Sequence, residues 1–164
     1  MTSEELLQRY DAGEREFRGA NLADADLADT YLQGADFRDA NFQGVYLTGA
    51  NLTHADLQDA DLQGANLQRA DLWGADLTGA KLQGANLHGA KLHAAKLQDA
   101  NLADVDLSDA NLSGVNLVGT TLCGVTIDGA ILDPGDIGGP GHILYALTAY
   151  EAEWVKHHRE ENES

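Results

Sequence analysis

The sequence predicts an all-β solenoid, a coil of short strands stacked on one another, with a short helix before it and another after it. Every fifth residue from Phe17 to Leu132 is Leu, Phe or Ile, at 24 positions without exception. Two residues before each of these stands Ala, Val or Thr in 23 cases, and Arg15 is the only departure. The residue just before the large one is mostly Asp or Asn, and Gly or Asp is common two residues after it. A fixed repeat of this kind is typical of solenoid folds.

A period of five residues fits neither a regular helix nor a straight strand. On an α-helix five residues advance by about 500°, so the large residues would spiral around every face. In a straight strand they would alternate between the two sides, because five is odd. Within one unit, however, the small and the large residue are two apart and share one side of an extended segment. Gly or Asp then suits a tight corner, which leaves Ala and Leu inside the coil and the other residues outside.

The repeated unit over residues 15–134, A-[DN]-L-x-[GD], resembles the pentapeptide repeat family, whose pattern is a small residue, Asp or Asn, Leu or Phe, a variable residue and often Gly. The resemblance implies a right-handed quadrilateral β-helix with four units in each coil. The 24 units then make about six coils. At a strand spacing of about 4.8 Å, the stack would be roughly 25–29 Å tall.

Coils of 20 residues would place surface residues that are 20 apart in ladders. One expected ladder contains amides that could bond between coils: Gln43, Gln63 and Gln83. Another contains acids: Glu16, Asp36, Asp56 and Asp76. Stacked like charges are destabilising unless neighbours relieve them, and Arg18 and Arg38 are candidates for this.

The segment before the repeat, residues 1–14, is expected to cover the open strand edge of the first coil with a short helix. Thr2 followed by Glu5 predicts a capping box. Leu6, Leu7 and Tyr10 share one helical face before Gly13, so we expect a helix over residues 3–11.

Residues 135–164 are expected to form a Gly-rich linker and a C-terminal helix from His142 to about Arg159, after Asp133-Pro134-Gly135 ends the repeat. An apolar stripe runs along this helix: Ile143, Leu144, Leu147, Tyr150 and Trp154. The stripe could simply cover the last coil, which leaves a monomer, or it could also pair with its twin in a homodimer. The resemblance favours the homodimer, because topoisomerase-binding members of the family dimerise through their C-terminal segments.

The composition excludes several classes of function. The 164 residues carry 27 acidic and 10 basic side chains and a formal net charge of −17, which argues against direct binding to nucleic acid or to an anionic membrane. Cys123 has no partner for a disulfide. No apolar run approaches the roughly 20 residues that a membrane span requires. The first residues show no secretory signal, so we expect a cytoplasmic protein.

No pattern in the sequence predicts catalysis, a cofactor or a metal site. His88 and His93 lie one unit apart, with Trp73 expected directly below His93, but this spacing matches no zinc motif. The many carboxylate pairs lack a pocket that would separate their pKa values. The glycines of residues 135–141 are not followed by the Lys-Ser/Thr of a phosphate-binding loop. We therefore expect a protein that is not an enzyme.

The outward acidic residues provide the candidate interaction surface. Residues 15–134 hold 17 acidic and seven basic side chains, and the acids gather on two of the four expected faces. The candidate acidic interaction face comprises Glu16, Asp36, Asp39, Asp56, Asp59, Asp76 and Asp99. The other acidic face comprises Asp26, Asp29, Asp106, Asp109 and Asp128.

Two functions remain open for this surface. The first is a structural or protein-interaction solenoid that presents its acidic surface to an unknown protein partner. The second follows from the resemblance, since some pentapeptide repeat proteins bind DNA gyrase or topoisomerase IV as mimics of DNA. The uninterrupted repeat has no projecting loop, which such members often carry, and acidic side chains also serve solubility, so the first function is preferred.

Overall fold

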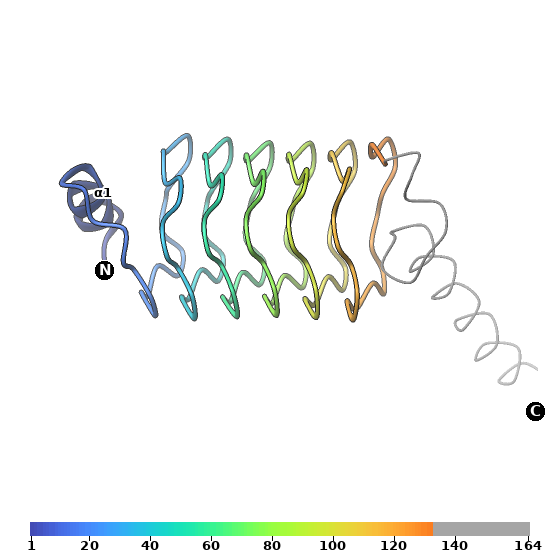
Figure 1. The fold of residues 1–164 in the computed structure, drawn as a ribbon, viewed down its shortest axis with the longest axis horizontal. Helices are drawn as coiled ribbons and strands as arrows, with labels where there is room; N and C mark the ends of the chain where they lie inside the picture. Colours follow the sequence, from blue (N-terminus) through green and yellow to red (C-terminus); the bar gives the residue numbers. More distant parts are fainter. Residues whose placement is uncertain (133–164) are drawn as a thin grey trace, which may run out of the picture.

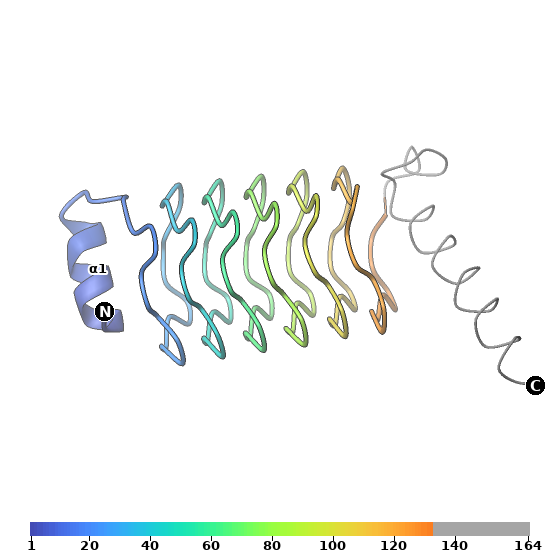
Figure 2. The same ribbon diagram turned by 90° about the horizontal axis from the view of Figure 1, so that it is seen from below.

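The computed structural model of the chain describes residues 1–132, which form one helix and a column of stacked coils (Figure 1). Helix α1 spans Ser3–Asp11 and lies at the N-terminal end of the column, as Figure 2 also shows from below. The repeat that follows contains no continuous strand within the described part of the chain. Its extended segments are joined instead by isolated parallel β-bridges.

The coil repeats every 20 residues. Each bridge joins a residue to the one 20 positions later, from Glu16↔Asp36 to Asn111↔Ile131. The backbone φ is positive at every fifth residue from Gly19 to Gly129, so the chain turns four corners in each coil. The period of 20 agrees with the one that the sequence resemblance implies.

One repeat unit, residues 76–80, shows how the backbone is satisfied. The N–H of Asp76 donates to the carbonyl of Ala55 in the preceding coil (2.9 Å), and those of Leu77 and Gly79 donate to carbonyls in the following coil (2.8 and 2.9 Å). The N–H of Ala80 closes the corner on Leu77 at 3.0 Å. The N–H of Thr78 donates to the Asp76 carboxylate at 3.1 Å. All five amides of the unit are therefore paired, as a buried backbone requires.

The side-chain bond within this unit explains the preference for Asp or Asn before the large residue. All 15 Asp and Asn residues at this position, from Asn21 to Asn116, accept the N–H two residues later. Only a short side chain with an acceptor oxygen makes this bond. The repeat thus selects Asp or Asn for local backbone chemistry, and the acidity of the surface is partly a consequence.

The interior is filled by the large and small residues of the repeat. Their side chains are buried throughout the middle of the column, and Leu6 and Tyr10 of α1 belong to the same apolar cluster. Phe37 packs edge-on against Phe42, with ring centroids 5.0 Å apart, and stacks on Phe17 at 5.5 Å. Each buried Leu or Phe contributes about 1.5–3 kcal/mol relative to exposure.

Helix α1 lies where the sequence predicts a helix. The Thr2 hydroxyl accepts the N–H of Glu5 at 3.1 Å, which is one of the two bonds of the predicted capping box. The Glu5 carboxylate lies 3.7 Å from the Arg9 guanidinium. Among residues 1–132, α1 is the only helix, and its nine residues are too few to cross a membrane.

The expectations for the C-terminal segment fall outside the described residues. They concern the end of the repeat at Asp133-Pro134-Gly135, the linker and the helix over residues 142–159. They also include the apolar stripe of Ile143, Leu144, Leu147, Tyr150 and Trp154, and the homodimer.

Corner residues follow a second rule that links one coil to the next. Ten corners carry a residue other than Gly, and in nine of them the residue 20 positions later is Gly. At Gly79, for example, an added Cβ would lie 2.4 Å from the Asp59 Oδ1 atom. At seven of these nine glycines an added Cβ would lie within 3.0 Å of the corner side chain 20 residues earlier, so that side chain occupies the space that Gly leaves open. The exception is Asp39, which precedes Asp59.

We expect Gly79→Ala to destabilise the protein more than Gly84→Ala. Both positions have positive φ, which costs an Ala side chain about 1 kcal/mol, but a Cβ at Gly84 meets nothing within 4 Å. Only Gly79→Ala must also displace the Asp59 carboxylate. Urea unfolding of both variants measures the difference, and adding Asp59→Ala should abolish it. Equal destabilisation by the two glycine variants would contradict the corner rule.

Candidate acidic interface

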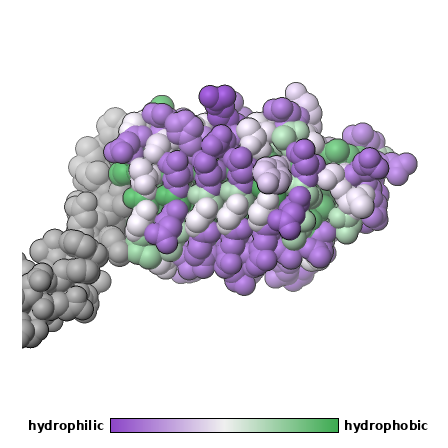
Figure 3. Space-filling model, turned by 180° about the vertical axis from the view of Figure 1, so that it is seen from behind, coloured by the Kyte–Doolittle hydropathy of each residue, from purple (hydrophilic) through white to green (hydrophobic). Residues whose placement is uncertain are grey.

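The predicted acidic residues lie on one side of the column. This first acidic face comprises residues 16–19, 36–39, 56–59, 76–79, 96–99 and 116–119. Glu16, Asp36, Asp56 and Asp76 follow one another through bridges, and Lys96 continues the ladder. Seen from behind, the surface of the column carries rows of hydrophilic side chains (Figure 3). The ladder expected from the sequence is therefore present.

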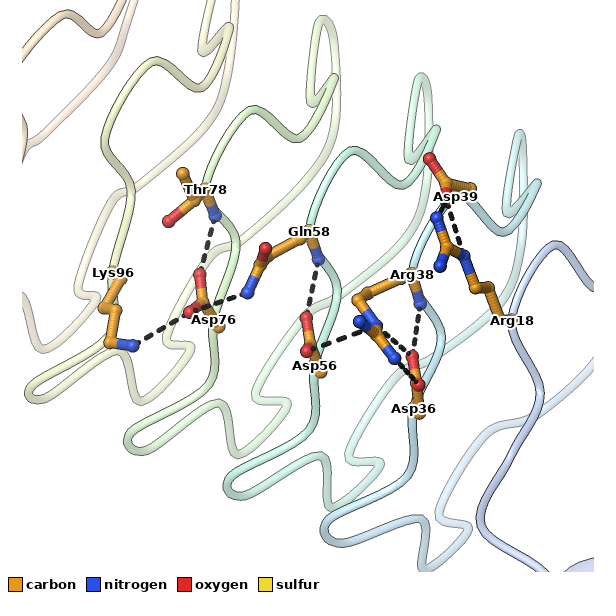
Figure 4. A network of polar contacts seen from close by, with 9 residues as sticks. All are labelled: Arg18, Asp36, Arg38, Asp39, Asp56, Gln58, Asp76, Thr78 and Lys96. Atoms are coloured by element: carbon orange, nitrogen blue, oxygen red, sulfur yellow. Dashed lines mark hydrogen bonds and ion pairs between the residues drawn. The ribbon is translucent and has the colours of Figure 1, made fainter.

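Arg38 relieves the repulsion within this ladder (Figure 4). Its guanidinium makes a two-point contact with the Asp36 carboxylate, with Nε 2.9 Å from Oδ1, and Nε also lies 3.6 Å from Asp56. The side-chain hydrogen bonds from Arg38 lower the pKa of Asp36 to about 2. A planar guanidinium that bridges two stacked carboxylates turns an unfavourable ladder into a favourable one.

Asp76 is stabilised by different neighbours. The Lys96 Nζ donates to its Oδ2 at 2.9 Å, and the Gln58 Nε2 donates to the same oxygen at 3.1 Å. Burial opposes ionisation of Asp76, but the hydrogen bonds from Thr78 and Lys96 together outweigh it and lower its pKa. Every carboxylate from Asp36 to Asp76 in the ladder therefore has a donor beside it.

The expectation that Arg18 also relieves the ladder is wrong. Arg18 reaches across to Asp39, with its Nε and Nη2 atoms 2.9 and 2.7 Å from Oδ2. Asp39 is the corner residue that lies before Asp59 instead of before a Gly. Since the space above Asp59 is not open to it, the Asp39 carboxylate points back to Arg18 in the preceding coil.

The expected hydrogen bonds between the stacked glutamines are also wrong. The Gln43 Nε2 donates to Asp61 at 2.9 Å, and no bond joins two of the ladder glutamines in the described structure. A carboxylate is a stronger acceptor than an amide carbonyl, so the amide bonds to the acid in the next coil. The Gln58 bond to Asp76 repeats this arrangement.

Trp73 contacts a histidine other than the expected one. Its ring packs edge-on against His54 with a centroid distance of 4.5 Å, whereas the His93 Nδ1 atom lies 2.8 Å from the Ser113 hydroxyl. His54 is a corner residue, and its ring extends over Gly74 beside Trp73. The backbone of Trp73 lies one coil before His93, as expected, but the Trp73 ring packs on the corner of the preceding coil.

Three ion pairs join one coil to the next, and sequence reasoning missed them. The Lys96–Asp76 pair recurs as Lys91–Asp71 at 3.2 Å and Lys81–Asp61 at 4.0 Å. Each lysine replaces the Asp or Asn of its unit and lies 20 residues after an Asp, which was the available signal. The pairs neutralise three carboxylates along one junction between coils.

The remaining carboxylates form the free part of the acidic surface. On the first acidic face, Glu16, Asp59 and Asp99 make no ion pair with Lys or Arg inside residues 1–132. The second acidic face comprises residues 26–29, 46–49, 66–69, 86–89, 106–109 and 126–129. Its five carboxylates have no such pair there either. These eight side chains can bind basic groups of a partner without breaking an internal pair.

The described part of the chain offers no metal-binding cluster. No three His, Cys, Asp or Glu side chains between residues 1 and 132 are placed to hold one ion. His88 and Asp109 form only a long contact of 3.9 Å.

Comparisons with known proteins agree with the repeat. A family model described as pentapeptide repeats matches residues 16–53, 55–93 and 90–129, with eight copies. No curated protein matches the chain.

Solved structures resemble the fold. A pentapeptide repeat protein from the thylakoid lumen of Arabidopsis thaliana is 31% identical, with a TM-score of 0.50, over 63% of this chain and 69% of that one. QnrB1, a plasmid-mediated fluoroquinolone resistance protein, is 26% identical, with a TM-score of 0.53, over 73% of this chain. The match spans only 59% of QnrB1. Rfr23 from the cyanobacterium Cyanothece 51142 is 29% identical, with a TM-score of 0.44, over 80% of this chain and 95% of that one.

We expect Arg38→Gln to raise the pKa of Asp36 from about 2 toward the ordinary value of 3.8. Because the folded pKa is the lower one, ionised Asp36 stabilises the protein above about pH 4, and this contribution is lost as the pH falls toward 2. NMR titration of the Asp36 carboxyl carbon measures the change. Arg18→Gln is the matched control, because Arg18 pairs with Asp39. It should leave the pKa of Asp36 unchanged. An unchanged Asp36 titration in Arg38→Gln would refute the assignment.

Proposed function

The chain belongs to the pentapeptide repeat family, and from this premise we propose that it is a non-enzymatic solenoid that presents an acidic surface to a protein partner. Pentapeptide repeat proteins fold as right-handed quadrilateral β-helices and are generally structural. The proposal includes a column of six coils, closed by α1 at one end and by residues 142–159 at the other. It also includes a cytoplasmic location and, through the C-terminal stripe, a homodimer.

The observation that carries the proposal is the set of eight carboxylates on the two acidic faces that have no Lys or Arg partner within residues 1–132. Corner residues such as Asp59 and Asp99 are exposed, and their backbone is held by bonds to the next coil (3.0 and 2.9 Å). A rigid array of this kind meets a basic surface at little cost in conformational entropy. Long-range attraction also accelerates the encounter with a basic partner.

A second candidate function is mimicry of DNA toward a type II topoisomerase such as DNA gyrase. The similarity to QnrB1 and the narrow acidic column favour it. The pairs formed by Lys81, Lys91 and Lys96 oppose it, because they interrupt the negative surface along one junction between coils. A protein partner of another kind therefore remains the first candidate.

The main proposal predicts that unpaired carboxylates on the acidic faces are needed for binding. Proteins captured by the immobilised wild-type chain would be identified, and the affinity of the purified partner measured by calorimetry. We expect Asp59→Asn/Asp99→Asn to weaken binding about tenfold, with a smaller loss at high salt because salt screens exposed charges. Asn tolerates positive φ, so both corners keep their conformation.

The matched control is Asp24→Asn/Asp104→Asn, which removes the same charge from the same kind of corner on a third side of the column. Its affinity should stay within about twofold of the wild type, since losses below about 1 kcal/mol are typical outside the contact. Equal losses in the two variants would show a response to net charge alone and would contradict binding at the first acidic face.

The second candidate is tested by a DNA gyrase supercoiling assay, with the protein titrated at two salt concentrations. Mimicry of DNA requires inhibition that weakens steeply as salt increases, because the contacts replace those made by phosphates. Our first candidate predicts no inhibition at high molar excess. Potent, salt-sensitive inhibition would instead make the topoisomerase the partner.

A further inference from the structure

One side of the column is electrically neutral. This neutral face comprises residues 31–34, 51–54, 71–74, 91–94 and 111–114, which lie on one side because residues 20 apart are joined by bridges. Its only charged side chains are Asp71 and Lys91, and these pair with each other at 3.2 Å. On a protein with a net charge of −17, a side with no net charge is a clear departure from the rest of the surface.

The neutral face lies between the two acidic faces. In each coil the chain passes the second acidic face, then the neutral face, then the first acidic face. The first acidic face has seven acidic and three basic side chains within the described repeat, and the second has five and one. A neutral strip thus runs along the column with negative charge on both of its flanks.

The neutral strip carries exposed aromatic side chains. Tyr31 is 69% exposed and Trp73 is 46% exposed, two coils apart along the strip. Trp73 is held in place by the edge-on contact with His54. Among residues 1–132, the Tyr31 hydroxyl makes no hydrogen bond to the protein. Aromatic anchors surrounded by a charged rim are the usual composition of a protein-binding surface.

We propose that the neutral face binds a basic amphipathic helix of a protein partner, with the apolar stripe of the helix on Tyr31 and Trp73 and its Lys and Arg side chains reaching the acidic faces on either side. This inference rests on the proposed function and names its contact surface. A helix whose apolar stripe is flanked by basic residues complements this surface, because the apolar stripe matches the neutral face and the basic residues match the two acidic faces beside it. Two copies of this chain would instead bring their acidic flanks together and repel.

The dimensions of the strip suit one helix lying along the column. Five coils at about 4.8 Å span roughly 20–25 Å, which a helix of about 16 residues covers at 1.5 Å per residue. One side of a coil, about three extended residues, is roughly 10 Å wide, close to the diameter of a helix.

The test uses the full-length protein and a synthetic helical peptide of about 16 residues, with a Leu stripe flanked by Lys. A matched peptide carries Glu in place of Lys. Fluorescence anisotropy of the labelled peptides measures both affinities, and we expect only the Lys peptide to bind. Trp73→Ala and Tyr31→Ala should each weaken its binding about tenfold, as expected for aromatic anchors.

The control variant is Tyr46→Ala, which removes an aromatic side chain of similar exposure (54%) from the second acidic face. It should change the affinity by less than about twofold. Circular dichroism verifies the fold of each variant, and Tyr31→Ala provides a variant that breaks no internal hydrogen bond if Trp73→Ala unfolds.

The outcomes separate this inference from the function on which it rests. Equal binding of the Lys peptide by all variants would show that the neutral face is not the contact surface. The proposed binding of basic partners by the acidic surface would still stand. Equal binding of the Lys and Glu peptides would overturn the role assigned to the acidic flanks. No binding of the Lys peptide even at low salt would overturn the inference, whereas the acidic-surface function is decided separately by the Asp59→Asn/Asp99→Asn variant.

Discussion

The hydrogen bonds between coils are the constraint on which the rest of the structure depends. A unit in the middle of the column, such as residues 76–80, donates one amide to the coil before it and two to the coil after it, and the other two are closed locally where the unit begins with Asp or Asn. Because these backbone groups are hydrogen-bonded, the buried Leu and Ala side chains are not surrounded by unpaired polar groups. The pattern of bonds also requires a left-handed backbone two residues after Leu, and it favours an acceptor side chain one residue before Leu, which 15 units carry as Asp or Asn. The composition of the repeat, rich in Asp, Asn and Gly, is thus a requirement of the backbone before it is a property of the surface.

The same bonds place every outward residue next to the one 20 positions away. Charges of the same sign therefore stack unless a neighbour intervenes, and Arg38 and Lys96 do so on the first acidic face. Four of the seven carboxylates predicted as the interaction surface are paired with Lys or Arg inside the protein. The functional acidic surface that we propose is consequently smaller than the sequence suggests, and it is concentrated at corners such as Asp59 and Asp99.

Periodicity predicted the features that depend on columns of residues 20 apart, except for the three Lys–Asp ion pairs, and it missed the contacts that depend on diagonals. The solenoid, the corners, the acidic ladder and the position of α1 all follow from patterns along the chain. Gln43 and Asp61, however, are 18 residues apart, and Arg18 and Asp39 are 21 apart. Such contacts depend on side-chain rotamers and on the slight offset between coils, which no repeat pattern specifies. The positions of the acidic residues alone do not reveal the neutral face, because it is defined by the near absence of charge.

Binding is assigned to carboxylates that have no Lys or Arg partner in the described part of the chain, and carbodiimide labelling of carboxyl groups tests this most directly. Labelling would be compared by mass spectrometry between the free protein and its complex with the captured partner. We predict that Asp59 and Asp99 lose reactivity in the complex, whereas Asp36 and Asp76, already shielded by Arg38 and Lys96, change little. Protection confined to Asp36 and Asp76, or no protection of any carboxyl group, would contradict the account.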